Sequence, residues 1–441
     1  MTSHAWTEAE GFDKSDSIGF YNHFLDENDK GRGVVNHSQM TLGADESASL
    51  LVIDMQNDFM LLPPGIGTPP GRFSVGSGLG MAPKLAEFIQ ENKDNFNSIV
   101  FTRDTHPIDH CSFFTNGGPF PPHCVINHEG AALHSSMLQF KNLPNAHVVF
   151  KGCHSDADSF GASQYRETSY LKKRQLGKCC PGGLCSEKTG AFFLTDKSKS
   201  WETYPFTNVE EYSNTNNPVL TPGDCPQSKW DNIQDQVGER FTLQHILSSD
   251  SKTGTHYIFI VGLAGDYCVK DTALNISAEI AANKATLGRD VKVVVLQPYV
   301  RYACLPLQYV GGNQVYSNEV LTNVKSGVFS NISKQKDIHN YIFKLGAQLT
   351  LLSKEEAETA AKNISSIKTA NNSSNPNVYG AFLTPTEEII KDYNGVGVTI
   401  AMVEPLLKKT GGRRRNKGGR SKRKTQRNKK LSKMKRSLKR R

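Results

Sequence analysis

The sequence lacks any apolar run that could cross a membrane. None of its 441 residues lie in a stretch that approaches the roughly 20 apolar residues of a bilayer-spanning helix. The first residues, MTSHAWTEAEGFDKSD, also lack the basic start and apolar run of a secretory signal. The nine cysteines are scattered and do not form the pattern of a disulfide framework. We therefore expect a reduced, intracellular protein.

Acidic residues are absent from residues 408–441, where Lys and Arg fill more than half of the positions. The whole chain carries a net charge of +9, although the part before this tail is net acidic. A low-complexity basic segment of this kind is expected to be disordered in isolation. It could bind nucleic acid or another polyanion, act as a nuclear localisation signal, or fold back on the acidic body. The expected location is cytoplasmic, with a nuclear one left open by the tail.

Cys268 follows a strong apolar strand pattern. Residues 256–263 (HYIFIVGL) are typical of a buried parallel strand, and residues 267–283 have helical spacing. A thiol in the first turn of a helix lies at the positive end of the helix dipole. This position lowers the thiol pKa and supplies backbone N–H groups for an oxyanion. The alternative is an inert buried cysteine that only fills space.

Two more polar residues stand at predicted strand ends. Asp54 ends the apolar segment 49–54, and Lys151 follows the short strand 147–150. The carboxyl ends of parallel strands share one edge of a sheet, where ligands bind in open α/β folds. Each residue alone could be a solvated charge or a helix cap. Together with Cys268 they predict a carboxylate, an ammonium and a thiol at one edge.

A metal site is predicted beside these residues. Asp104 and His106 follow the strand 98–103 and are two residues apart, so on an extended chain their side chains point the same way. His123 can complete a carboxylate-plus-two-imidazole site, and His110 is a further ligand or a supporting group. Mixed nitrogen and oxygen ligands suit a divalent zinc, iron or manganese ion.

With these residues in place, the chain resembles the nicotinamidases of the isochorismatase-like cysteine hydrolases. The matching segments, in the family's order, are LLVIDMQNDFM (50–60), FTRDTHPIDHCSFF (101–114), FPPHCVINHEGAALH (120–134), VVFKG with DSFGA (148–162), and VGLAGDYCVKDTALN (261–275). The resemblance implies a cysteine amidohydrolase of NAD metabolism and pyridine nucleotide salvage that acts on a small amide, nicotinamide. A homo-oligomer stays open.

The resemblance also assigns roles to residues. Asp54, Lys151 and Cys268 would be the catalytic triad, and Asp104, His106 and His123 the metal ligands. Phe59 and Phe120 would flank the pyridine ring. A cis Leu263–Ala264 bond would place the Ala264 N–H beside that of Cys268 as an oxyanion hole. Thr105, Phe120 and Asp158 depart from the usual family residues, and Asp158 leaves the exact substrate in doubt.

The order of elements predicts a doubly wound, mainly parallel six-stranded sheet with helices on both faces. The expected strands are 49–54, 98–103, 147–151, 256–263, 291–297 and 347–352, and the expected helices are 82–93, 239–248, 267–283 and 335–345. The expected organisation is an N-terminal extension (1–48), the hydrolase domain (49–352), an appended segment (353–407) and the tail.

A βαβ unit needs roughly 30 residues, so the longer separation between Lys151 and Cys268 predicts an insertion at about 164–240. Its Cys179, Cys180, Cys185 and Cys225 could bind a structural zinc or could be incidental in a surface loop.

Two classes of function fit the sequence. The first is an active metal-dependent nicotinamidase, with a related amidase for another small amide as the variant within that class. The second is a nucleic-acid-associated protein that uses the hydrolase domain as a scaffold and its tail for binding. The complete set of Asp54, Lys151 and Cys268 favours the enzyme, because a scaffold has no physical need for all three.

Overall fold

The fold is described from a computed structural model. It describes residues 21–22, 25–60, 73, 75, 78–113, 116, 120, 122–166, 186–202, 236–248, 250–310, 313–316, 350–351, 378–382 and 386–407. The basic tail, the helix expected at 335–345 and the four insertion cysteines lie outside these residues. In the described part, no helix is long and apolar enough to cross a membrane.

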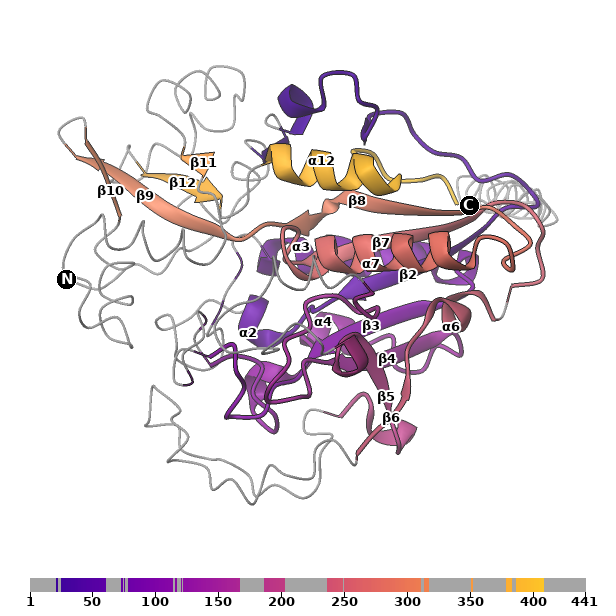
Figure 1. Ribbon diagram of the computed structural model, residues 1–441, viewed down its shortest axis with the longest axis horizontal. Helices are drawn as coiled ribbons and strands as arrows, with labels where there is room; N and C mark the ends of the chain where they lie inside the picture. Colours follow the sequence, from indigo (N-terminus) through magenta and orange to yellow (C-terminus); the bar gives the residue numbers. More distant parts are fainter. Residues whose placement is uncertain are drawn as a thin grey trace, which may run out of the picture.

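Five parallel strands form the centre of the molecule (Figure 1). They are β2 (Ser47–Ile53), β3 (Ile99–Asp104), β4 (Ala146–Lys151), β7 (His256–Leu263) and β8 (Val291–Arg301). Nearly every residue of β2, β3 and β7 is buried, which explains why their sequences are continuous apolar runs rather than alternating ones. The expectation of a mainly parallel α/β sheet is confirmed.

The strand order reverses next to β2, the place at which open α/β sheets form a ligand crevice. Along the sheet the order is β8-β7-β2-β3-β4, so the chain first builds outward from β2 to β4 and then returns to the other side of β2 with β7. Ligand sites in open α/β sheets lie at such a switch point, beyond the carboxyl ends of the strands. Residues that follow β2 and β7 therefore face the same crevice.

Among the described residues, the sheet has nine strands rather than the six expected. Beyond β8 it gains β13 (Thr399–Ala401) and β1 (Val35–Asn36), both parallel, and beyond β4 it gains the antiparallel β5 (Ala191–Leu194) and β6 (Val237–Arg240). Residues 399–401 are too short to give a strand pattern by themselves. They pair with β8 because that strand offers an open edge.

The strand expected at 347–352 does not join this sheet. Instead β11 (Thr350–Leu351) belongs to a four-stranded antiparallel sheet with β9 (Cys304–Val310), β10 (Asn313–Tyr316) and β12 (Val378–Phe382). β9 and β10 project beyond the end of β8 in Figure 1.

Within the described residues, the helices are fewer than the strands. They are α2 (Asn57–Met60), α3 (Gly78–Asn92), α4 (Ser135–Leu138), α6 (Leu243–Leu247), α7 (Cys268–Asn283) and α12 (Thr386–Val396), with 3₁₀ turns at Lys93–Asn95, Glu129–Ala131, Ser186–Lys188 and Lys197–Lys199. α7 packs along β7 and β8, and α12 packs on α7 (Figure 1). Residues 386–407, expected to be an appended segment, thus cover and extend the central sheet.

An ion pair joins α12 to the helix that begins at Cys268. Lys270 is buried on α7, and its Nζ lies 2.7 Å from Asp392 Oδ2 and 3.4 Å from Glu388 Oε1 on α12. Both carboxylates keep about a fifth of their side-chain surface exposed. Solvent therefore screens this ion pair only in part, and the pair links α12 to α7.

We expect Lys270→Met to lower the free energy of unfolding by about 1–3 kcal/mol, between the values for exposed and fully buried pairs, because two carboxylates lose their partner. Lys292→Met is the matched control, since Lys292 is exposed and its nearest partner oxygen, on Asp290, is 3.7 Å away. Urea unfolding of both variants checks this. Equal stabilities of the two variants would contradict it.

Candidate active site

The three strand-end residues singled out by the sequence lie together in the structure. Lys151 Nζ is 2.8 Å from Asp54 Oδ2 and 3.5 Å from Cys268 Sγ. Asp54 and Lys151 are fully buried, and Cys268 is 5% exposed. A lysine ammonium thus sits between a carboxylate and a thiol at the carboxyl ends of β4, β2 and β7.

Local structure orients the Asp54 carboxylate. Asp54 directly follows β2 and has φ of 46°, a left-handed conformation that is uncommon for a residue other than glycine and often found at functional sites. Thr102, on the neighbouring strand β3, donates its hydroxyl to Asp54 Oδ1 at 2.6 Å and accepts from Asp54 N at 2.9 Å. One carboxylate oxygen is held by Thr102, so the other faces Lys151.

The three groups change one another's protonation. Burial raises the pKa of the Asp54 carboxyl, and the Lys151 ammonium opposes that shift. Burial also raises the pKa of the Cys268 thiol, and again Lys151 opposes it. Burial alone would lower the pKa of Lys151, but the negative charges of Asp104 and Asp54 outweigh it and hold the pKa well above its usual range. Lys151 is therefore the fixed positive charge of the site.

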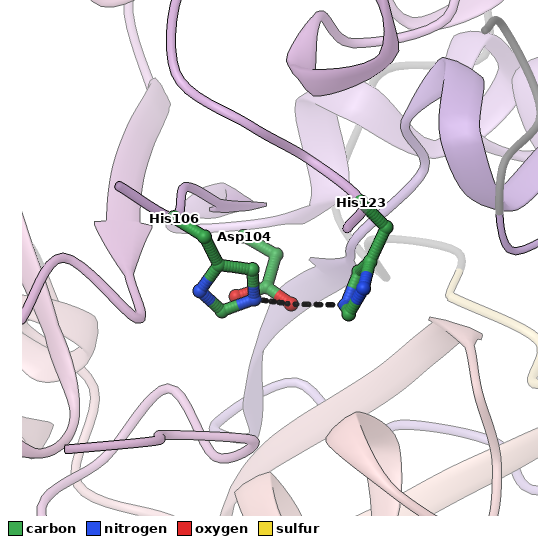
Figure 2. Close-up of side chains that lie close together, drawn as sticks. All are labelled: Asp104, His106 and His123. Atoms are coloured by element: carbon green, nitrogen blue, oxygen red, sulfur yellow. Dashed lines mark ion pairs between the residues drawn. The ribbon is translucent and has the colours of Figure 1, made fainter. Parts of the chain in front are cut away.

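The predicted metal ligands also converge (Figure 2). Asp104 Oδ2 lies 3.1 Å from His106 Nε2 and 3.9 Å from His123 Nε2, and the three side chains are almost fully buried. His106 Nδ1 lies 3.0 Å from the Gly152 carbonyl oxygen, which turns Nε2 toward Asp104. Two imidazole nitrogens and one carboxylate oxygen around one point are a donor set that fits a divalent metal ion.

Gly152 allows the triad and the metal ligands to approach each other. Its φ is +68°, and a Cβ there would lie 2.7 Å from His106 Nδ1 and 2.8 Å from Asp104 Oδ1. A side chain would therefore push the end of β4 away from the ligands. With glycine in place, Lys151 Nζ comes within 3.2 Å of Asp104 Oδ1 and links the two groups.

The charges around Asp104 favour its ionised form. Burial alone would raise the pKa of this carboxyl, but His106 and Lys151 outweigh burial and lower the pKa. The pKa of His106 is raised because the Asp104 carboxylate outweighs the effect of burial. A carboxylate that stays ionised is the form that ligates a metal.

His110, expected as a further ligand or a supporting group, lies beside His106. Its ring packs 4.0 Å from that of His106, and it groups with His106 and Asp158 rather than with Asp104 and His123. Its Nδ1 is 2.7 Å from Ser112 Oγ. Burial and the nearby His106 keep the pKa of His110 well below its usual range, so it is neutral. Burial raises the pKa of Asp158 to about 6.

Aromatic rings line the site on the side of His123. Phe59 and Phe120 have ring centroids 5.5 Å and 6.0 Å from that of His123. Phe73 lies between them, 5.1 Å from His123 and 5.3 Å from Phe120. Tyr267, next to the nucleophile, lies 6.1 Å from Phe120. Such a wall suits a flat, apolar ring in contact with the metal ligands.

Three residues of the site were not singled out from the sequence. They are Thr102, Phe73 and Gln56. Gln56 Nε2 donates to the Asp104 carbonyl oxygen at 2.7 Å, and its Oε1 accepts from Asp104 N at the same distance. Gln56 lies close to Asp54 in the chain, and Thr102 lies close to Asp104. This proximity was the only sequence signal for their place in the site. Phe73 follows a segment without a pattern.

One cysteine differs from the expectation of a wholly reduced chain. Cys124, Cys153 and Cys268 are free. Cys111 is disulfide-bonded. Cys268, the predicted nucleophile, is thus a free thiol.

The chain is similar to several known proteins. Residues 48–167 match the isochorismatase domain family. The nicotinamidase of Acinetobacter baylyi is 30% identical over 178 residues, 35% of this chain and 76% of that protein. The nicotinamidase of Schizosaccharomyces pombe is 26% identical over 230 residues, 52% of this chain and 75% of that protein. The zinc complex of the Pyrococcus horikoshii pyrazinamidase is 23% identical, with a TM-score of 0.31 and coverage of 58% and 86%.

The fold and the site define a hydrolase that acts on an amide bond. The chain belongs to the nicotinamidases of the isochorismatase-like hydrolase family.

We expect His123→Ala and Asp104→Ala to lower bound zinc, iron or manganese to well below one per chain, because each removes one of three protein ligands. His134→Ala is the control, since His134 is a half-buried histidine whose side chain caps α4 and belongs to none of the candidate metal-binding groups of the described residues. Elemental analysis of the purified proteins is the measurement. Full occupancy in both ligand variants would place the metal elsewhere.

Proposed function

We propose that this protein hydrolyses nicotinamide to nicotinate and ammonia, in a metal-dependent reaction that passes through a thioester on Cys268. The relatives named nicotinamidase support this substrate. The observation that carries the proposal is the buried Asp54–Lys151–Cys268 group lying directly beside Asp104, His106 and His123. Nucleophile, proton carrier and ligand set are then within reach of one small molecule.

The first step activates the thiol. Asp54 accepts the proton of the Cys268 thiol, because its raised pKa brings it closer to that of a thiol than an ordinary carboxyl. Lys151, 3.5 Å from the sulfur, stabilises the thiolate that forms. The start of α7 adds the positive end of its dipole at Cys268.

The second step transfers the acyl group. The thiolate attacks the amide carbon, and the carbonyl oxygen becomes an oxyanion. This oxyanion accepts hydrogen bonds from the N–H groups of Ala264 and Cys268. The Leu263–Ala264 peptide bond is cis, as the resemblance implied. Asp54 passes its proton to the leaving nitrogen, which departs as ammonia and leaves the thioester.

The third step restores the enzyme. Asp54, again a carboxylate, accepts a proton from a water molecule that attacks the thioester carbon. The sulfur leaves as a thiolate and takes this proton back from Asp54. A divalent ion held by Asp104, His106 and His123 would supply Lewis-acid chemistry, polarising water and orienting the substrate ring. Phe59, Phe73 and Phe120 would hold that ring by its faces and edges.

A second candidate within the same class is an amidase for another small amide. Asp158 favours it, because this carboxyl, with a pKa of about 6, lies beside His106 and His110. A polar acid at that place could select a substrate ring with an extra hydrogen-bond donor.

The test is ammonia release from nicotinamide and from a panel of small aromatic and aliphatic amides. We expect nicotinamide to have the highest kcat/KM, and Cys268→Ala to lower it by about 10³-fold or more. Cys153→Ala, which removes another buried free thiol, should keep most of the turnover. A panel member preferred over nicotinamide would favour the second candidate, and turnover by Cys268→Ala would contradict the thioester.

A further inference from the structure

Residues that have no part in the proposed catalytic steps pack against the loop between β7 and α7. This loop, residues 264–267, carries the Ala264 N–H and leads directly into Cys268. Its position relative to the thiol therefore decides whether two N–H groups point at one oxyanion. The following inference rests on the proposed function, because it concerns the loop's part in that reaction.

The end of β8 and the residues that follow it hold the loop by two hydrogen bonds. The Gly265 N–H donates to the Arg301 carbonyl oxygen at 2.7 Å. The Ala303 N–H donates to Asp266 Oδ1 at 2.9 Å. The first bond involves the residue directly before Tyr302, and the second involves the residue directly after it. The loop is therefore hydrogen-bonded on either side of Tyr302.

The Tyr302 ring fills the space between these two bonds. A Cβ added to Gly265 would lie 2.6 Å from both Tyr302 Cδ1 and Val300 Cγ1, so the ring lies against the backbone of Gly265 with no room to spare. Tyr302 is only 4% exposed. Loss of this ring would leave a cavity directly behind the oxyanion loop.

The N-terminal extension in turn holds Tyr302. The ring of Tyr21, fully buried, stacks on that of Tyr302 with centroids 3.5 Å apart and planes 17° apart. The Tyr302 hydroxyl donates to Gln297 Oε1 at 2.7 Å, and Gln297 Nε2 donates to Asn22 Oδ1 at 2.8 Å. Residues 21 and 22 lie outside the segment that matches the family domain.

We propose that Tyr302, backed by Tyr21, is a positioning residue for the oxyanion hole. Stacked tyrosines press on Gly265 and keep the Ala264 and Cys268 N–H groups aimed at the same point. Catalytic groups lose their effect when they are displaced by about 0.5 Å or more, and oxyanion stabilisation acts on the transition state rather than on the bound substrate. The N-terminal extension would thereby support the chemistry without touching the substrate.

The test compares ligands that do and do not use the hole. With nicotinaldehyde, the Cys268 sulfur would add to the carbonyl carbon, the thiol proton would move to Asp54, and the carbonyl oxygen would become an oxyanion that accepts hydrogen bonds from the hole; nicotinate would only occupy the site. We expect Tyr302→Leu to lower kcat by about 10–100-fold and to weaken inhibition by nicotinaldehyde by a similar factor. The KM for nicotinamide and the inhibition constant of nicotinate should change by less than about threefold.

Tyr302→Phe separates the ring from its hydroxyl. This variant keeps the ring against Gly265 and loses only the hydrogen bond to Gln297. Its kcat should therefore stay within about threefold of the wild-type value. Tyr299→Leu is the matched control. Tyr299 is equally buried and lies three residues earlier, on β8, but its ring packs on Phe88 and its hydroxyl donates to Glu404. It should lose stability and keep kcat.

The inference is overturned if Tyr302→Leu loses thermal stability as Tyr299→Leu does while kcat and nicotinaldehyde inhibition stay unchanged. It is also overturned if nicotinate binding falls as much as kcat, because the damage then extends to the whole pocket. If Tyr302→Leu does not fold, Tyr21→Leu carries the same measurements with the Tyr302 ring still present. Failure of the unchanged protein to hydrolyse nicotinamide would instead contradict the proposed function.

Discussion

A single buried ammonium joins the two halves of the site. Lys151 Nζ has no exposed surface and lies 2.8 Å from Asp54, 3.2 Å from Asp104 and 3.5 Å from the Cys268 sulfur. A charge without solvent is costly unless opposite charges surround it. The two carboxylates stabilise Lys151, and Lys151 in turn allows both carboxylates and a thiolate to exist close together. The proton carrier, the nucleophile and the ligand set therefore depend on one another.

The sheet makes this arrangement possible. Parallel strands β2, β4 and β7 deliver their last residues to one edge, and the switch in strand order beside β2 opens the crevice there. The segments outside the matched family domain strengthen the same region. Residues 386–407 extend the sheet and hold α7 through Lys270, and Tyr21 stacks on Tyr302, which lies against Gly265 in the loop before Cys268. Both termini of the described chain thus contribute to the support of the nucleophile.

The sequence predicted the centre of the fold better than its edges. Strands β2, β3, β7 and β8 are long apolar runs, and their polar end residues could be recognised because burial on both faces leaves few other reasons for a charge. Strand β13 could not be predicted, because Thr399–Ala401 is stabilised by pairing with β8 rather than by its own pattern. Thr102 and Tyr302 were missed for a related reason. Their roles depend on contacts with Asp54 and Gly265, which are distant in the chain.

The pH dependence of Cys268 alkylation tests the role of Lys151 most directly. Burial raises the pKa of this thiol and Lys151 opposes the shift, so Lys151→Gln must raise the pKa further. Because only the thiolate reacts, the alkylation rate at neutral pH should fall about tenfold for each unit of that rise, and the rate profile should move to higher pH. Iodoacetamide labelling, followed at Cys268 by mass spectrometry, gives the profile. Identical profiles for Lys151→Gln and the unchanged protein would contradict the account.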